Sequence, residues 1–370
     1  MFSIETTYYL FNALVIIVPV LCWIASRTGM KFFCRLGYLL LAFVAVIRYD
    51  IGADYNAYVA KFDSMAEEIS SHTVLLSDLI YDEPFSYLLS FCFQHCAHPS
   101  TWVIGAYFLL TLLFIYLALE RYKAHALGLL VFIVSYVYFD TWDWIRQALS
   151  MAIFLYAIRH IEDGRFVRYL ICIGLAAAAH YSALILLPFY FVRYIRLSPK
   201  TCALTALIFL LVVVPFSDTI RNILFRIVPY YSQLYADTAY SEQGGNTSTT
   251  FYLSTLVLIL TIYMSDSKHS ALTLLLTIGV LFKIVAMGNL NISRVAWYFT
   301  ATEMILVSTI WQESTYKIRR IGIIGIMFVH FVLLNFVFIP NRFRWVVPYE
   351  TIFSTEYEQQ VFRSRDWLKE

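Results

Sequence analysis

The sequence is poor in charge for its length. Only 14% of its 370 residues are charged, whereas a soluble domain carries about 25%. Hydrophobic residues reach 60% and aromatic residues 18%, which is more apolar surface than a water-soluble fold of this size can hide. The composition therefore predicts that lipid surrounds much of the chain.

Three further features are missing, and each excludes a kind of site or segment. The net charge is only +2 and no long basic run occurs, so nucleic acid is not expected as a partner. The six cysteines form no Cys-x-x-Cys pair, so no metal site is expected. The first residues lack the basic start and small-residue cleavage site of a signal peptide, so the first apolar run is expected to remain as a membrane helix.

Apolar runs that cross or nearly cross a bilayer recur along the chain. They predict an all-α, polytopic membrane protein with about twelve transmembrane helices in a single integral membrane domain, 1–370. The runs are 8–25, 32–47, 100–119, 125–139, 143–161, 166–179, 181–195, 200–217, 250–265, 270–287, 295–311 and 321–339. A shorter stretch, 84–96, would invert all later loops if it crossed the membrane. We interpret it as a re-entrant or interfacial helix.

The distribution of Lys and Arg predicts the orientation. Fifteen basic residues fall in one alternate set of loops, near 27–35, 121–123, 159–168, 193–200, 268 and 317–320, and seven fall on the opposite side before the C-terminal tail. The positive-inside rule places the first set in the cytoplasm. Three segments then face outward: a first periplasmic loop at 48–83, a second at 218–250, and a C-terminal tail at 340–370.

Three arginines lie at the predicted outer ends of membrane helices: Arg48, Arg146 and Arg294. An ionisable group at membrane depth is costly unless it faces a cavity or a partner. Guanidinium groups bind phosphate through paired hydrogen bonds and keep their charge when partly desolvated. We therefore expect the three to converge on a polyanionic ligand. The alternative is that each one snorkels to the interface or pairs with a nearby carboxylate.

Candidate bases occupy the same predicted level. His180 interrupts an alanine run between two cytoplasmic loops, so the chain must turn back near it. Such a histidine serves as a general base, or packs and donates to a backbone carbonyl. Asp54 stands at helical spacing from Tyr58, and Glu83 precedes Pro84 at a helix start. Most of the outward carboxylates are expected to be ordinary solvated loop acids.

The run from Arg48 to Tyr58 resembles the signature loop of the EpsG-like membrane proteins, part of the broader Wzy group of O-antigen and exopolysaccharide polymerases. The resemblance continues at 83–85, 145–150 and 180–185, and more weakly at 293–295 and 347–349. It spans roughly residues 48–350. Ala53 departs from the family pattern, where threonine is expected, but the charged members of the loop are intact.

The resemblance implies a metal-independent glycosyltransferase of the multi-spanning GT-C type that needs no cofactor. Such a polymerase transfers glycan carried on undecaprenyl pyrophosphate onto a new lipid-linked repeat unit, at the periplasmic face of the bacterial inner membrane. It implies pyrophosphate binding by Arg48, Arg146 and Arg294, and a base drawn from Asp54, His180 and Glu83. A chain-length regulator protein is a further implied partner in lipopolysaccharide biosynthesis.

Substrate contacts are expected from Tyr55, Tyr58, Gln147, Tyr298 and Tyr349. Two other functions stay open at this point. One is an O-antigen ligase or another lipid-linked sugar transferase. The other is a flippase or transporter of lipid-linked oligosaccharide, whose charges would line a path through the whole bilayer.

Overall fold

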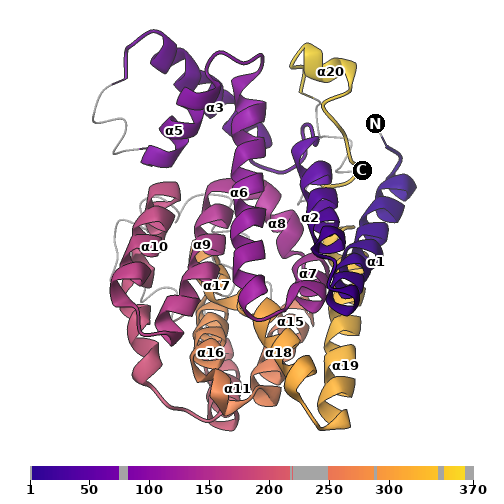
Figure 1. The fold of residues 1–370 in the computed structure, drawn as a ribbon, viewed down its shortest axis with the longest axis vertical. Helices are drawn as coiled ribbons and strands as arrows, with labels where there is room; N and C mark the ends of the chain where they lie inside the picture. Colours follow the sequence, from indigo (N-terminus) through magenta and orange to yellow (C-terminus); the bar gives the residue numbers. More distant parts are fainter. Residues whose placement is uncertain are drawn as a thin grey trace. The chain divides into compact units, whose positions relative to one another are not determined.

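A computed structural model describes residues 2–74, 82–216, 219, 249–286, 290–340 and 346–362. These residues form helices and turns (Figure 1). Within the same ranges there is no β-sheet, and strand-like pairing is confined to one isolated bridge between Arg48 and Thr351. The prediction of an all-α fold is confirmed for this part of the chain.

The chain divides into two compact units. Unit 1 consists of Met1–His160, Arg165–Pro188 and Phe331–Glu370, and unit 2 of Ile161–Gly164 and Phe189–His330. The sequence predicted one membrane domain without an internal boundary, and that assignment stays a prediction. The predicted second periplasmic loop, 218–250, lies almost wholly outside the described residues.

Unit 1 holds most of the N-terminal helices and the end of the chain. Its helices are α1 (Ile4–Thr28), α2 (Lys31–Val46), α3 (Tyr55–Ser70), α5 (Pro84–Phe93), α6 (Pro99–Arg121), α7 (His125–Val134), α8 (Val137–Asp143), α9 (Ile145–Glu162), α10 (Phe166–Ala179), the first part of the 3-10 helix η1 (Tyr181–Tyr194), the π-helical η4 (Leu334–Phe338) and α20 (Thr355–Glu358). The two ends of the unit meet, because the Phe2 amide donates to the Tyr349 carbonyl at 3.1 Å.

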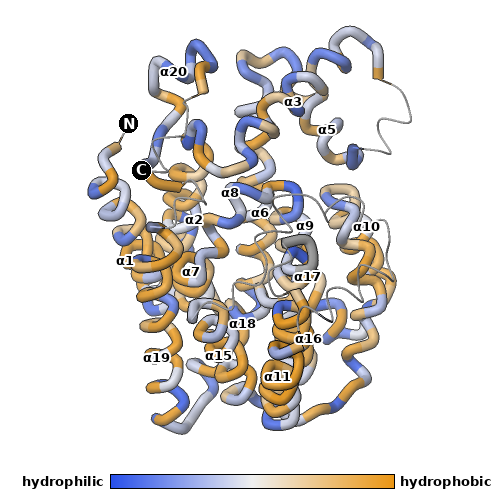
Figure 2. Tube along the Cα trace, turned by 180° about the vertical axis from the view of Figure 1, so that it is seen from behind, coloured by the Kyte–Doolittle hydropathy of each residue, from blue (hydrophilic) through white to orange (hydrophobic). Residues whose placement is uncertain are grey.

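Unit 2 is built from α11 (Pro199–Val213), η2 (Val214–Phe216), α15 (Thr249–Met264), η3 (Ser267–His269), α16 (Ser270–Val285), α17 (Leu290–Thr300), α18 (Glu303–Glu313) and most of α19 (Lys317–Leu333). Helix α16 packs against α11, α15 and α17. Figure 2 shows α11 and α16 as hydrophobic along most of their length, whereas α3 of unit 1 mixes hydrophilic and hydrophobic residues.

Most described residues of the twelve predicted apolar runs fall on helical backbone, but the number of crossings is not confirmed. Five described helices are long and apolar enough to span a membrane, or six if the bent pair α7 and α8 is one span. These two helices meet at 62°. The predicted run 295–311 is divided between α17 and α18. Helix α5 has ten residues and measures about 15 Å, half the thickness of a hydrocarbon core.

Local sequence signals explain where several helices begin and end. The Ser3 hydroxyl caps α1 by accepting from the Thr6 amide at 3.1 Å. Gly29 ends the same helix in the left-handed conformation, with φ +74°, which glycine adopts without steric cost. Proline occupies the first position of α5, α6 and α11, where its missing amide hydrogen breaks no helical bond.

Helix α3 is amphipathic and covers the ends of α5 and α6. Its apolar stripe, at helical spacing, is buried: Tyr55, Val59, Phe62, Met65 and Ala66. α3 packs against both α5 and α6, and the Phe62 and Tyr107 rings stack with centroids 5.9 Å apart. This packing fixes the positions of the polar residues on the remaining faces of α3.

Unit 2 contains a buried contact between a histidine and a carboxylate that the sequence did not reveal. His330 Nε2 of α19 lies 3.2 Å from Glu303 Oε1 of α18, and both side chains are 5% exposed. The Thr261 hydroxyl of α15 donates to the same carboxylate oxygen at 3.3 Å. The contact therefore links three helices. Removing the histidine would leave the buried carboxylate with one hydrogen-bond donor fewer, which is destabilising.

We predict that His330→Leu lowers the free energy of unfolding by about 1–3 kcal/mol, because the buried Glu303 carboxylate loses the hydrogen bond from the imidazole. The double variant His330→Leu/Glu303→Leu should recover most of this loss, since apolar replacement of a whole buried pair is often neutral. Denaturant unfolding of the purified protein in detergent would measure both. A double variant no more stable than the single one contradicts the prediction.

Candidate functional site

The loop that follows α2 is held by the side chain of Arg48. Its Nη1 donates to the Ala45 carbonyl at 2.5 Å and its Nη2 to the Trp142 carbonyl at 3.1 Å. The guanidinium also lies over the Trp142 ring, with Cζ 5.6 Å from the centroid. Arg48 is only 2% exposed. It thus ties the end of α2 to the end of α8, and direct contact with a diphosphate stays a prediction.

The same loop docks onto Asp143 through a close backbone approach. The Ala53 amide donates to Asp143 Oδ1 at 2.7 Å. The preceding residue, Gly52, has φ +110°, and a Cβ placed there would lie 2.5 Å from the same oxygen. Only glycine fits this position. The departure at Ala53 leaves the contact intact, because the backbone amide makes it.

Arg146 lies in the first turn of α9, directly after the break between α8 and α9. Its Nη1 forms an ion pair with Glu83 Oε2. Its Cζ lies 5.9 Å from the ring centroid of Tyr58 on α3, a favourable cation–π distance. Its Nε is buried without a hydrogen-bond partner in the described part of the chain. The side chain as a whole is 22% exposed, so an anion can reach part of the guanidinium.

Glu83 is the centre of the cluster. Its side chain, 8% exposed, contacts Arg146 through Oε2, and its Oε1 lies 3.0 Å from His180 Nδ1. Burial raises the pKa of the carboxyl, but the His180 hydrogen bond and the Arg146 charge outweigh burial and hold the pKa below its usual value. The carboxylate therefore stays ionised at neutral pH. Its φ of +57° is strained for a residue with a side chain.

His180 lies where α10 ends and the chain turns back. Its backbone is extended, with φ −160° and ψ 118°, and η1 then returns beside α10, where the Tyr169 hydroxyl donates to the Leu186 carbonyl at 2.6 Å. The predicted turn at His180 is therefore present. When Nδ1–H donates to the Glu83 carboxylate, Nε2 is left as a proton acceptor. The imidazole is 23% exposed.

Four of the residues singled out in the sequence come together in unit 1: Tyr58, Glu83, Arg146 and His180. Others lie elsewhere in the same unit. Asp54 precedes α3, Gln147 is buried on α9, Tyr55 is buried on α3, and Tyr349 donates its hydroxyl to the Val44 carbonyl. Arg294 and the fully buried Tyr298 belong to α17 of unit 2. The expected convergence of three arginines stays a prediction.

Two contacts of this region escaped the sequence reasoning. The Asp143 carboxylate belongs to the outward acids, most of which the sequence predicts to be solvated, yet it is buried and receives the 48–54 loop. Lys61 of α3 pairs with Asp82 at 2.5 Å, one residue before Glu83. The adjacency of Asp82, Glu83 and Pro84 was the available signal. A carboxylate between a guanidinium and an imidazole supplies an anion-binding group and an oriented base within one site.

Comparison with known proteins gave one family match. The family model that matches is described as the EpsG family, and the match covers residues 31–351. This range includes all four residues of the cluster. No curated protein matches the chain, and no solved structure does either.

The docking of the 48–54 loop gives a prediction for Gly52→Ala. We expect a loss of about 1–3 kcal/mol in the free energy of unfolding, because the added Cβ would meet Asp143 Oδ1 and the backbone would be strained. Gly174→Ala, where nothing lies within 4 Å of the added Cβ, is the matched control and should not destabilise the protein. Equal stability of the two variants, measured by thermal unfolding in detergent, would contradict this.

Proposed function

Because this chain belongs to the EpsG family, a Wzy-like family of polysaccharide polymerases, we propose that it is a membrane polymerase of the Wzy type. It would transfer glycan linked to undecaprenyl pyrophosphate onto a new lipid-linked repeat unit, at the periplasmic face of the bacterial inner membrane. The observation that carries this proposal is the cluster in which Glu83 contacts both Arg146 and His180. Five to six apolar helices of spanning length support the multi-pass membrane setting.

Arg146 has the properties that a diphosphate leaving group requires. The acceptor hydroxyl attacks the anomeric carbon of the donor sugar, and the bond from that carbon to the diphosphate oxygen breaks. The departing diphosphate keeps the electron pair and gains negative charge. A guanidinium that is partly desolvated stabilises this charge more strongly than it would in water. In the proposal this occurs without a metal ion.

His180 is the proposed base for the acceptor hydroxyl. The Glu83 carboxylate orients the imidazole through Nδ1 and stabilises the imidazolium that forms when Nε2 takes the hydroxyl proton. Glu83 itself is a poor base, because a carboxylate whose pKa lies below its usual value has little affinity for the hydroxyl proton. We therefore assign Glu83 a positioning role. Asp54 stays the second candidate base in this proposal.

The remaining predicted residues have subsidiary roles. Arg48 holds the 48–54 loop next to the cluster, and Arg294 is the proposed second ligand of the diphosphate. Tyr58, beside Arg146, is the proposed first sugar contact, and the predicted substrate contacts of Tyr55, Gln147, Tyr298 and Tyr349 belong to the same proposal. A GT-C architecture and a chain-length regulator partner belong to the same proposal.

We predict that Arg146→Ala lowers the polymerisation rate by about 10²–10³-fold, the usual effect of removing one group that stabilises developing charge. Arg146→Lys should fall between Arg146→Ala and the wild type, because lysine keeps the charge but loses paired hydrogen bonding. Arg168→Ala, an exposed arginine on α10, is the control and should match the wild type. The readout is glycan length made in vitro by purified protein from a synthetic lipid-linked repeat unit.

A cell-based readout separates the polymerase from its nearest rivals. Loss of a polymerase leaves one repeat unit on the final acceptor, whereas loss of a ligase leaves none. Loss of a flippase removes both products, because no repeat unit reaches the outer face. Long glycan chains in the Arg146→Ala strain, with the protein inserted at wild-type level, would refute the proposed role of Arg146.

We further predict that His180→Ala lowers kcat by about 10²–10⁴-fold, the range for loss of a general base. Glu83→Gln should cause a smaller loss, since the amide still accepts a hydrogen bond but carries no charge. His95→Ala, an exposed histidine after α5, is the control. A kcat of His180→Ala equal to that of the wild type would remove His180 from the mechanism.

A further inference from the structure

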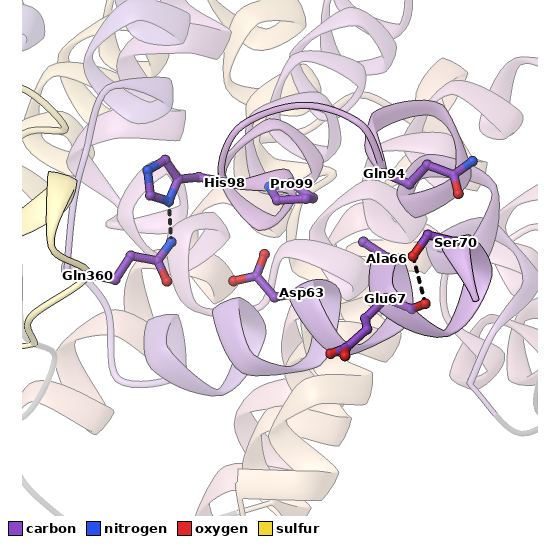
Figure 3. A pocket seen from close by; sticks show the side chains of 8 residues that line it. All are labelled: Asp63, Ala66, Glu67, Ser70, Gln94, His98, Pro99 and Gln360. Carbon is purple, nitrogen blue, oxygen red and sulfur yellow. Dashed lines mark hydrogen bonds between the residues drawn. The ribbon is translucent and has the colours of Figure 1, made fainter. Parts of the chain in front are cut away.

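A polar cavity lies beside α3, and no residue of the Glu83 cluster lines it. Its volume is about 480 Å³, within the range of about 300–1,000 Å³ for small-molecule sites. Asp63, Glu67 and Ser70 of α3 line one wall, at i, i+4 and i+7 on one helical face. Ala66 lies on the same helix, and Gln94, His98, Pro99 and Gln360 complete the lining (Figure 3).

Contacts between three chain segments build the walls of this cavity. The Gln360 amide lies 2.6 Å from His98 Nδ1, and the Ser100 amide donates to Asp63 Oδ1 at 3.0 Å. The Tyr357 ring packs on the His98 ring, with centroids 4.8 Å apart. Asp63 comes from α3, His98 and Ser100 from the start of α6, and Gln360 from the C-terminal segment. The cavity is thus a feature of the folded chain and not of one helix.

The charge of the lining excludes a phosphate ligand. No Lys or Arg lines the cavity, and in the described part of the chain neither Asp63 nor Glu67 takes part in an ion pair. The nearest cation in sequence, Lys61, pairs with Asp82 instead. Two uncompensated carboxylates repel an anion. The ligand must therefore be uncharged or positively charged.

The mixture of donors and acceptors narrows the ligand class further. Carboxylates accept hydrogen bonds only, whereas the Gln94 and Gln360 amides and the Ser70 hydroxyl both donate and accept. Sugar hydroxyls also donate and accept, so they match this lining. Among the described residues no three His, Cys, Asp or Glu side chains lie together as metal ligands would.

We propose that this cavity is a glycan subsite that binds an uncharged or amino-substituted stretch of the polymer, away from its diphosphate. This inference rests on the proposed polymerase function for the identity of the glycan. Helix α3 contributes to both sites, since Tyr58 contacts Arg146 and Glu67 lines the cavity, but nine residues of α-helix place these two side chains on opposite faces.

Binding of glycan without lipid or diphosphate tests the subsite directly. The probe is the host's own repeat-unit oligosaccharide, released from its lipid by mild acid and added to the full-length protein in nanodiscs. Titration calorimetry should show binding that is at least tenfold weaker in Glu67→Ala. Glu68→Ala, which removes the same charge from the adjacent position outside the cavity lining, should bind within twofold of the wild type. Inorganic pyrophosphate should not compete.

The outcomes separate the subsite from the polymerase proposal. Equal oligosaccharide binding by Glu67→Ala and the wild type overturns the subsite, as does an equal loss in Glu68→Ala or the absence of any binding by the wild type. Arg146→Ala should still bind the oligosaccharide while making no polymer. If the wild type binds the oligosaccharide at Glu67 but forms no polymer from a lipid-linked unit, the polymerase proposal fails and the subsite stands.

Discussion

The candidate site depends on the contacts that the Glu83 carboxylate makes with Arg146 and His180. It joins three helices that are separate in the sequence, because Glu83 precedes α5, Arg146 begins α9 and His180 ends α10. Each partner needs it for a different reason: the guanidinium gains a counter-charge, and the imidazole gains an orienting acceptor. A single buried carboxylate therefore sets both the electrostatics and the hydrogen-bond geometry of the cluster.

Sequence reasoning located the members of this cluster but not their connections. Arg146, His180 and Glu83 stood out because each breaks an apolar pattern near a helix end. Their mutual contacts depend on tertiary packing across 63 and 97 residues, which periodicity does not encode. The same limit applies to Arg48, whose burial against the Trp142 carbonyl follows from the docking of the loop and not from its local sequence.

The sequence predicted where helices lie better than it predicted where they break. The run 166–179 coincides with α10, because a poly-apolar segment ends at His180. By contrast, breaks at Tyr136 and at Ala301–Thr302 divide two predicted spans, and no glycine or proline marks either one. The pair formed by Glu303 and His330 was missed for a related reason: each residue is a lone polar group in an apolar helix, and only packing reveals that they meet.

The contacts of residues 349–352 with residues 44–48 have a consequence for the order in which the protein folds. The Tyr349 hydroxyl bonds to the Val44 carbonyl, 305 residues away, and Ile352 and Thr351 pair with Ile47 and Arg48. A ribosome needs about 15–60 s to translate that interval. The first two helices are thus made long before residues 349–352, which pair with the end of α2 and the loop after it. Until residues 349–352 have been translated, the loop at Arg48 lacks these contacts.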